Sequence, residues 1–312
     1  MRNLQAVEVY LSLLEKRGLG ASRLRRLVGL LSSSGLKVED AFSEDGFEAV
    51  QRAGLWRSKE GWTLEPRAGE VAEQLATQGV EMVASAEILG AAIDREYIPP
   101  FLFIKGNRSL LWSHAVGFCG SRDASERGLE VAADIAEQVA LQGFVCTSGG
   151  AKGVDMAAHT AALRAGGATV VVLAEGILGY RMRAALREVW DPQRFLLVSE
   201  FHPADRWLAG RAMQRNRTIC ALSNALVLIE ARLSSGTFAA GEVALEMGLP
   251  LFTAEYGATS EVNAGNRYLL GRGAHPLRAS RATRRANLAE MLHLVQEPRT
   301  RGAQLSLLGA AP

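Results

Sequence analysis

The chain has 312 residues, of which 48% are hydrophobic, and its formal net charge is +2 at neutral pH. This length and composition support a sizeable core and suggest one large domain with a smaller one. No run approaches the roughly 20 apolar residues of a membrane span, and the first residues lack a signal-peptide core, so we expect a globular cytoplasmic protein with no membrane contact.

The three cysteines, Cys119, Cys146 and Cys220, lie in or beside predicted strands and helices without metal-ligand spacing. We therefore expect buried thiols in a reducing compartment, with no metal site and no cofactor. The small net charge does not by itself indicate nucleic-acid binding, so the placement of individual charges has to decide that question.

Residues 1–60 are predicted to form a small helical domain. Leucines at helical spacing fall into two segments that Gly18-Leu19-Gly20 separates, as in a helical hairpin of the helix-hairpin-helix or SAM-like kind. Such a turn can present helix-start amides to a DNA phosphate, with Arg17 and Arg23 nearby. A solvated basic face of a small bundle explains the same pattern.

Residues 61–113 form a predicted bridge to the main domain. We expect a helix near 66–78, a short strand over 80–83, and an entry strand over 101–104. Pro99 and Pro100 forbid a helix just before the entry strand, so that segment is extended.

The centre of the chain, residues 116–175, is predicted to fold as strand, helix, strand, helix and strand. The apolar run 115–119 is short and continuous, as in a strand that is buried on both faces of a parallel sheet. Ser125 is placed to cap a helix that ends near Gly143, and 144–146 is the next strand. A helix over 156–165 follows.

Two turns of this unit carry the features of an anion site. The first is Gly120, Ser121 and Arg122, and the second contains Ser148, Gly149, Gly150, Lys152, Gly153 and Asp155. Glycines allow backbone amides to approach a ligand, and a helix start favours negative charge. The simpler alternative is that the glycines only permit tight turns. Because both turns follow parallel strands and both carry a cation, the sequence favours phosphate binding.

Further apolar runs at 169–173, 195–198, 225–229 and 251–253 predict more strands, separated by crossover-length segments. The fold class is therefore α/β, with an extended Rossmann-like, doubly wound and mostly parallel sheet over 114–295. A last helix over 288–295 precedes a flexible tail at 296–312.

Two later segments add polar residues at the same edge of the sheet. Residues 213–219 are predicted to be a loop before a helix, in which Arg215, Asn216 and Arg217 form a fork for a phosphate or a base edge. Ser235, Gly236 and Thr237 precede a helix predicted from about 238 to 247. Their hydroxyls and amides can bind an anion, or simply cap the helix.

As an ordered set, these motifs resemble the DNA-processing protein A family, also called Smf. The set comprises Gly120-Ser121-Arg122, Ser148 to Asp155 with Ala158-His159, Arg215 to Ile219, and Ser235-Gly236-Thr237. The resemblance extends to about residue 295. Lys152 stands where the family usually has Arg, and Met213-Gln214 replaces an expected Phe-Pro pair, which suggests a divergent member. We expect this member to lack the C-terminal winged helix that many members carry.

The resemblance implies a single-stranded-DNA-binding protein without catalytic activity, which loads the recombinase RecA in natural transformation and forms a homodimer. By motif position, Arg122, Lys152, Arg215 and Arg217 would line the DNA pocket. The other motif residues, Gly120, Ser121, Ser148, Gly149, Gly153 and Asp155, would shape it. Single-strand binding also uses stacking platforms. The aromatic candidates are Phe118, Phe144, Tyr180 and Trp207, of which the first two are better explained as core.

A second function stays open. The same superfamily contains phosphoribohydrolases and nucleotide-binding sensors of bacterial defence modules, whose motifs are similar to Gly149–Gly153 and Gly236-Thr237. Hydrolysis needs a carboxylate near the ribose, and only Glu230 and Glu242 are close in sequence. His159 could act as a general base, although a structural hydrogen bond explains it better.

The last residues, Gln304, Leu305, Ser306, Leu307 and Leu308, resemble the short peptide by which bacterial proteins bind the replicative sliding clamp. A terminal segment with a polar anchor and several aliphatic side chains can fill a preformed pocket. A tail without a partner is the alternative, since five-residue matches arise by chance.

Overall fold

The computed structural model describes residues 3–89, 98–256, 260–280, 282–283 and 285–296. Within these residues one sheet has nine strands, in the order β1-β2-β6-β5-β4-β3-β7-β8-β9. The strands are β1 (Glu81–Ala84), β2 (Phe101–Gly106), β3 (Ala115–Gly120), β4 (Val145–Gly149), β5 (Thr169–Val172), β6 (Phe195–Ser199), β7 (Ala225–Ile229), β8 (Leu251–Ala254) and β9 (His275–Leu277).

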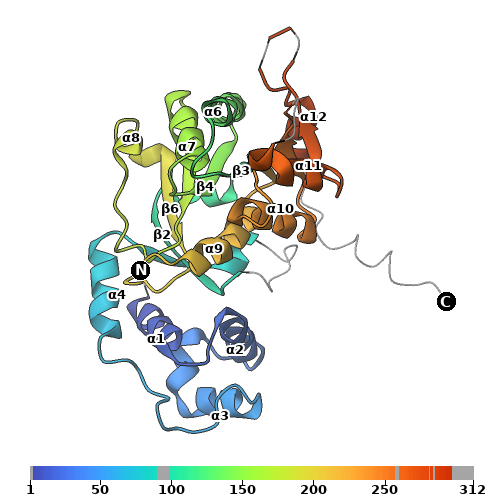
Figure 1. The fold of residues 1–312 in the computed structure, drawn as a ribbon. Helices are drawn as coiled ribbons and strands as arrows, with labels where there is room; N and C mark the ends of the chain where they lie inside the picture. Colours follow the sequence, from blue (N-terminus) through green and yellow to red (C-terminus); the bar gives the residue numbers. More distant parts are fainter. Residues whose placement is uncertain (1–2, 90–97, 257–259, 281, 284, 297–312) are drawn as a thin grey trace, which may run out of the picture.

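The helices fall into an N-terminal group and a group that surrounds the sheet (Figure 1). The first comprises α1 (Leu4–Glu15), α2 (Ala21–Ser33), α3 (Glu44–Arg52), α4 (Ala68–Thr77) and α5 (Ser85–Leu89). The second comprises α6 (Glu126–Leu141), α7 (Val154–Arg164), α8 (Ala184–Arg187), α9 (Ala209–Ala221), α10 (Gly236–Glu246), α11 (Ala264–Leu270) and α12 (Ala289–Gln296).

The sheet is parallel from β6 through β9, and antiparallel at one end. β2 pairs antiparallel with β6, and β1 pairs antiparallel with β2. The central strand β3 has β4 on one side and β7 on the other, both parallel to it. The strands that follow β3 in sequence are added first on its β4 side and then, from β7 on, on its other side. The strand order therefore changes direction at β3, and open α/β sheets bind ligands at such a topological switch point.

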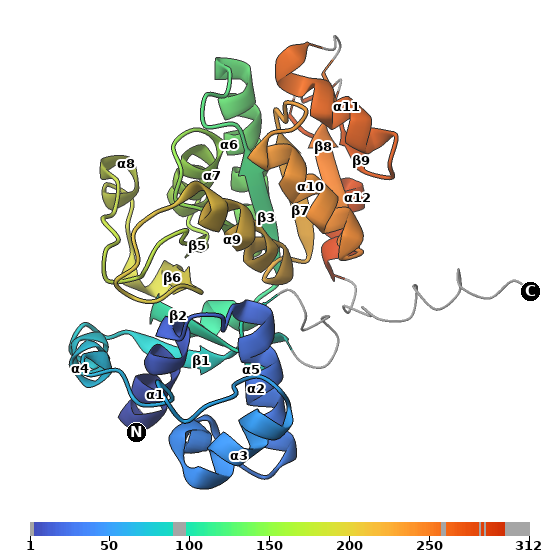
Figure 2. The same ribbon diagram turned by 60° about the horizontal axis from the view of Figure 1, so that its bottom comes forward.

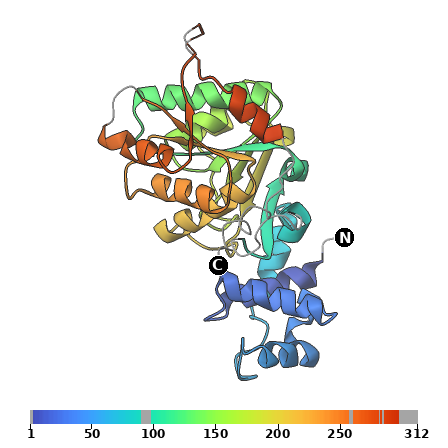
Figure 3. The same cartoon turned by 90° about the vertical axis from the view of Figure 1, so that its right-hand side faces the viewer.

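Helices cover both faces of the sheet because its strands are apolar on both faces. In β3, Ala115 to Cys119 are all buried. One face is covered by α6, α7 and α12, through residues such as Ile135, Ala158 and Met291. The other face is covered by α9, α10 and α11, through residues such as Ile219 and Ala240. Figure 3 shows these two helical layers with the sheet between them. The predicted doubly wound, mostly parallel fold is confirmed.

The N-terminal helices form their own apolar cluster around Leu13, Leu27 and Trp62. The indole of Trp62 donates a hydrogen bond to the carbonyl of Ala41 at 2.9 Å. A second cluster joins α1 and α4 to the sheet, with Tyr10 of α1 beside Phe103 of β2. Figure 2 shows β1 and β2 between the N-terminal helices and the parallel part of the sheet. This contact attaches the helical group to one end of the sheet.

Most predicted elements exist within one to three residues of their expected bounds. The short β9 was missed, because three residues carry too little pattern to indicate a strand. The predicted clamp-binding segment, residues 304–308, lies outside the described residues. The division into domains stays a prediction. Over the described parts of the chain, no helix has the length and apolar character needed to cross a bilayer.

Candidate nucleic-acid interface

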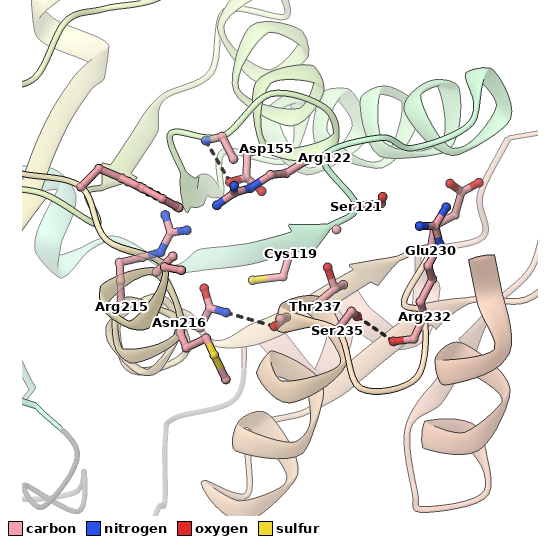
Figure 4. Close-up of a pocket in the computed structure, with 17 residues that line it drawn as sticks. Cys119, Ser121, Arg122, Asp155, Arg215, Asn216, Glu230, Arg232, Ser235 and Thr237 are labelled. Carbon is pink, nitrogen blue, oxygen red and sulfur yellow. Dashed lines mark hydrogen bonds between the residues drawn. The ribbon is translucent and has the colours of Figure 1, made fainter. Parts of the chain in front are cut away.

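A cavity of about 400 Å³ opens where the turns after β3, β4 and β7 meet helix α9 (Figure 4). Nine of the predicted site residues line it: Gly120, Ser121, Arg122, Asp155, Arg215, Asn216, Ser235, Gly236 and Thr237. They come from four segments that are far apart in sequence, and the carboxyl edge of the parallel sheet brings them together.

A second cavity of about 370 Å³ adjoins the first. Gly150 and Lys152 line it from the turn after β4, and Tyr180 and Arg183 line it from the segment after β5. Four residues line both cavities: Arg122, Ala151, Trp207 and Arg215. The two cavities are therefore neighbouring parts of one site.

Arg215 is the most deeply placed cation of the site. It lies in α9, is only 6% exposed, and donates from Nη1 to the carbonyl of Val172 at 2.7 Å. Its Nε has no hydrogen-bond partner among the described residues. A buried charged donor without a partner is costly. Figure 4 shows its guanidinium extending from α9 toward Arg122 and Asp155, which also line the first cavity.

The prediction that residues 213–219 form a loop was wrong, because they lie inside α9. Gly210 is the only helix breaker between 209 and 221, and Ala, Met, Gln and Arg are good helix formers. Asn216 faces the first cavity but its amide donates to the carbonyl of Gly236 at 3.2 Å, which ties α9 to the start of α10. The fork predicted at these positions is thus replaced by one buried arginine and a structural asparagine.

Arg217 lies outside both cavities. It lines a different hollow between α9 and α10, beside Met213, Gln214 and Glu242. A helix turns its side chains by about 100° per residue, so Arg215 and Arg217 point to opposite sides. In an extended loop, as predicted from the sequence, side chains two positions apart point to the same side and could have shared a site; in a helix they do not.

Three of the glycines at the site are required by close packing, whereas a fourth lies in open space. A Cβ on Gly153, which has φ 84°, would lie 2.4 Å from the carbonyl oxygen of Ser121, and one on Gly120 would lie 2.4 Å from Val154. These two glycines let the turns after β3 and β4 approach each other. Gly149 similarly makes room for Arg215. At Gly236, which is exposed and lines the first cavity, nothing lies within 4 Å of the place that a Cβ would take.

The start of α10 is the better anion site of the two helix starts. Ser235 caps this helix by accepting a hydrogen bond from the amide of Phe238 at 3.1 Å. Its first residues, Gly236 and Thr237, line the larger cavity, and a helix start leaves its first amides without intrahelical acceptors. At α7 the first amide, of Val154, already donates to Ser121.

The cations at the mouth have protein partners. The guanidinium of Arg122 lies 5.0 Å from the ring centroid of Trp207, and Lys152 forms an exposed 2.6 Å ion pair with Asp123. Lys152 in turn lowers the pKa of the Asp123 carboxyl. Since both groups of the ion pair are solvated, a competing phosphate can displace Asp123 at small cost.

Two acids line the larger cavity, and each is engaged. Burial raises the pKa of the Asp155 carboxyl, while the nearby Arg215 acts in the opposite direction. Its Oδ2 accepts from the amide of Ala151 at 3.3 Å. Glu230, at a positive φ of 51°, accepts from the amide of Ser125 at 2.8 Å and from its hydroxyl. Glu230 therefore fixes the start of α6 rather than facing a ligand alone.

Ser148 and His159 lie beneath the site. The hydroxyl of Ser148 donates to the carbonyl of Phe118 at 2.7 Å, which joins β4 to β3. His159 is fully buried, and burial lowers its pKa to about 4. Its Nε2 lies 2.7 Å from the carbonyl of Gly149, which can only accept, so this nitrogen carries the proton. This bond holds the end of β4 in place.

Across the two cavities, five cations face three acids. The cations are Arg122, Lys152, Arg183, Arg215 and Arg232, and the acids are Asp155, Glu175 and Glu230. Arg183 and Arg232 were not among the site residues predicted from the sequence. Arg232 follows β7 as Arg122 follows β3, so the rule that found one could have found the other. Among the described residues, no group of histidine, cysteine and acidic side chains is arranged to hold a metal.

Comparisons with known proteins identify relatives of this chain. A family model for DNA recombination-mediator protein A matches residues 89–286. The DNA processing protein DprA of Streptococcus pneumoniae is 32% identical over 177 residues, which cover 56% of this chain and 62% of that protein. Protein Smf of Escherichia coli is 33% identical over 193 residues, which cover 58% and 52% respectively. The chain thus matches about half to three fifths of these relatives' length.

Solved structures agree on the fold. DNA processing protein A from Streptococcus pneumoniae superposes with a TM-score of 0.69 at 24% identity, over 89% of this chain and 95% of that one. The protein of that name from Helicobacter pylori, described for its single-stranded DNA binding mode, gives a TM-score of 0.54 at 25% identity, over 63% and 90%. Because the family model matches more than half of the chain, this protein belongs to the DNA recombination-mediator protein A (DprA/Smf) family.

Proposed function

We propose that this protein binds single-stranded DNA at the two joined cavities. The observation that carries the proposal is the convergence of Arg122, the buried Arg215 and the start of α10 on one cavity. Each of these groups suits a phosphate oxygen, and together they leave a positive excess. Family membership and the single-strand binding of the Helicobacter pylori protein support the choice of DNA as the ligand.

The biological role that we propose is recombination mediation. The protein would place the recombinase RecA on incoming single strands during natural transformation, in the cytoplasm and as a homodimer. The family description as a recombination mediator supports this role. A non-enzymatic mechanism is supported by the candidate acid–base groups, because His159 lies buried below the cavities and Glu230 is bonded to Ser125.

The test is binding of a labelled oligo-dT to the full chain across a salt series. We expect tight binding that weakens with salt, with a slope of about −0.7 per neutralised phosphate. Arg122→Ala should weaken binding by about tenfold and flatten the slope, since it removes one charged contact. The matched control is Arg164→Ala, an exposed arginine in the last turn of α7, whose first turn lies at the site.

The outcomes separate the candidate functions. Equal affinity and slope for wild type and Arg122→Ala would contradict the assigned site. No binding to oligo-dT, together with binding of a mononucleotide, would favour the nucleotide sensor that the superfamily also contains. Nothing in the geometry of the described residues prefers that alternative now, so single-stranded DNA stands as the proposed ligand.

A further inference from the structure

The wall between the two cavities contains an exposed tryptophan. Trp207 lines both cavities and is 45% exposed, with the Arg122 guanidinium 5.0 Å from its ring centroid. An indole that keeps about half of its surface in water contributes much less to folding than a buried one. Exposure alone is ordinary for a tryptophan, but Trp207 also lies where two cavities with an excess of cations adjoin.

The backbone that carries Trp207 is held in place. The segment just before Trp207 accepts two backbone hydrogen bonds from the segment after β5. The amide of Gly176 donates to the carbonyl of Asp205 at 2.8 Å, and the amide of Leu178 donates to the carbonyl of Pro203 at 3.1 Å. Arg211 of α9 pairs with Asp205 at 2.7 Å and also donates to the carbonyl of Arg206 at 2.6 Å. The indole thus projects from a fixed segment, as a preorganised contact does.

A buried arginine also lies where the two cavities adjoin. Arg215 also lines both cavities, is nine-tenths buried, and its Nε has no partner among the described residues. A phosphate that lies there would be bracketed by Arg122 and Arg215, with one cavity on each side of it. A polynucleotide has this arrangement, since each phosphate separates two nucleosides.

We propose that the two cavities hold consecutive nucleotides of one single strand, and that a base stacks on the exposed surface of Trp207. This inference rests on the proposed function and extends it from phosphate contacts to base contacts. Aromatic stacking tolerates any base, because every base has a π-face. It also requires an unpaired base, so it provides a physical reason to prefer a single strand over a duplex.

The experiment compares oligo-dT with an abasic tetrahydrofuran oligomer of equal length, which carries the same phosphates. Stacking contributes about 1–3 kcal/mol per base, so we expect the wild type to prefer oligo-dT by about tenfold or more. Trp207→Leu should lose this preference, with unchanged affinity for the abasic strand. Trp207→Phe should retain most of the preference for oligo-dT. The salt slopes of all three proteins should agree, because no charge changes.

The control is Trp190→Leu, which removes an equally exposed tryptophan, 48% exposed, that lines neither cavity. It should behave as the wild type does. In a second measurement, oligo-dT should quench part of the tryptophan fluorescence of the wild type, and Trp207→Phe should remove that quenching.

Two results would overturn the inference, and they are distinguishable. If the wild type binds oligo-dT but Trp207→Leu keeps its preference over the abasic strand, or loses affinity for both strands equally, Trp207 does not stack on a base. If the wild type binds neither oligomer, the proposed function itself is wrong and the stacking role falls with it.

Discussion

Replacing Glu200 by glutamine should change how the stability of this protein depends on pH. Glu200 directly follows β6 and is 3% exposed. Its Oε2 accepts from the hydroxyl of Thr218 at 2.8 Å, whereas its Oε1 has no hydrogen-bond partner among the described residues. Burial raises its pKa from 4.5 to about 7, against the opposing effects of the Thr218 hydrogen bond and of nearby arginines.

The sign follows from proton linkage. The folded state holds the Glu200 proton more tightly than the unfolded state, so this group's contribution is fully present below about pH 4.5 and is lost as the pH rises through about 7. One pKa unit corresponds to about 1.4 kcal/mol, which puts the full loss at about 3 kcal/mol. Glutamine stays neutral and avoids that loss. Its own amide lacks an acceptor at a cost of about 1 kcal/mol, so the net gain at pH 8 is about 2 kcal/mol.

Urea unfolding at pH 5 and pH 8 measures the effect as a difference between variant and wild type. The difference is needed because His159 has the opposite effect in the wild type. Its pKa is lowered to about 4, so its contribution to stability rises with pH between about 4 and 6.5 and masks the loss that Glu200 causes. Glu188→Gln, at an exposed carboxylate, is the control. If Glu200→Gln differs from the wild type by the same free energy at both pH values, the buried-carboxylate argument is refuted.

Three further predictions concern the site. Gly149→Ala should weaken oligo-dT binding by about tenfold and lower the melting temperature, since the new methyl would lie 1.7 Å from the Arg215 guanidinium. Gly150→Ala, whose new methyl has its nearest neighbours at 3.7 Å, should leave the melting temperature unchanged. Asp123→Asn should tighten binding by about twofold at low salt and not at high salt, because it releases Lys152 from its ion pair; equal gains at both salts would contradict this. Ser125→Ala should cost about 1–2 kcal/mol in urea unfolding by removing the cap of α6, and an unchanged midpoint would argue against that role.

The sheet and its carboxyl edge were predictable because they rest on strong patterns. Short apolar runs such as 115–119 and 225–229 are buried on both faces, so their hydrophobicity is continuous. Glycine-containing turns after two such strands marked the edge where ligands bind. The cap at Ser125 was predicted and confirmed, since it depends only on local chemistry.

The missed parts of the site depend on long-range packing. The buried residues of α9 are Arg215, Asn216, Thr218, Ile219, Cys220 and Ala221, so half of the inward positions are polar and the apolar helical period is hidden. Arg215 and Asn216 of that buried face line the candidate site, where local rules and tertiary context conflict. Sequence also cannot separate glycines that serve packing, such as Gly153, from those that leave room for a ligand, such as Gly236.

The position of β3 has a consequence for how the chain folds. β3 pairs with β4, which lies about 30 residues later, and with β7, which lies about 110 residues later. During synthesis one edge of this buried apolar strand therefore stays open until β7 has emerged. Contacts of such long sequence separation slow folding, because loop closure must precede them. The strand arrangement that forms the candidate binding edge thus also leaves one edge of β3 unpaired in the nascent chain until the second half of the sheet is complete.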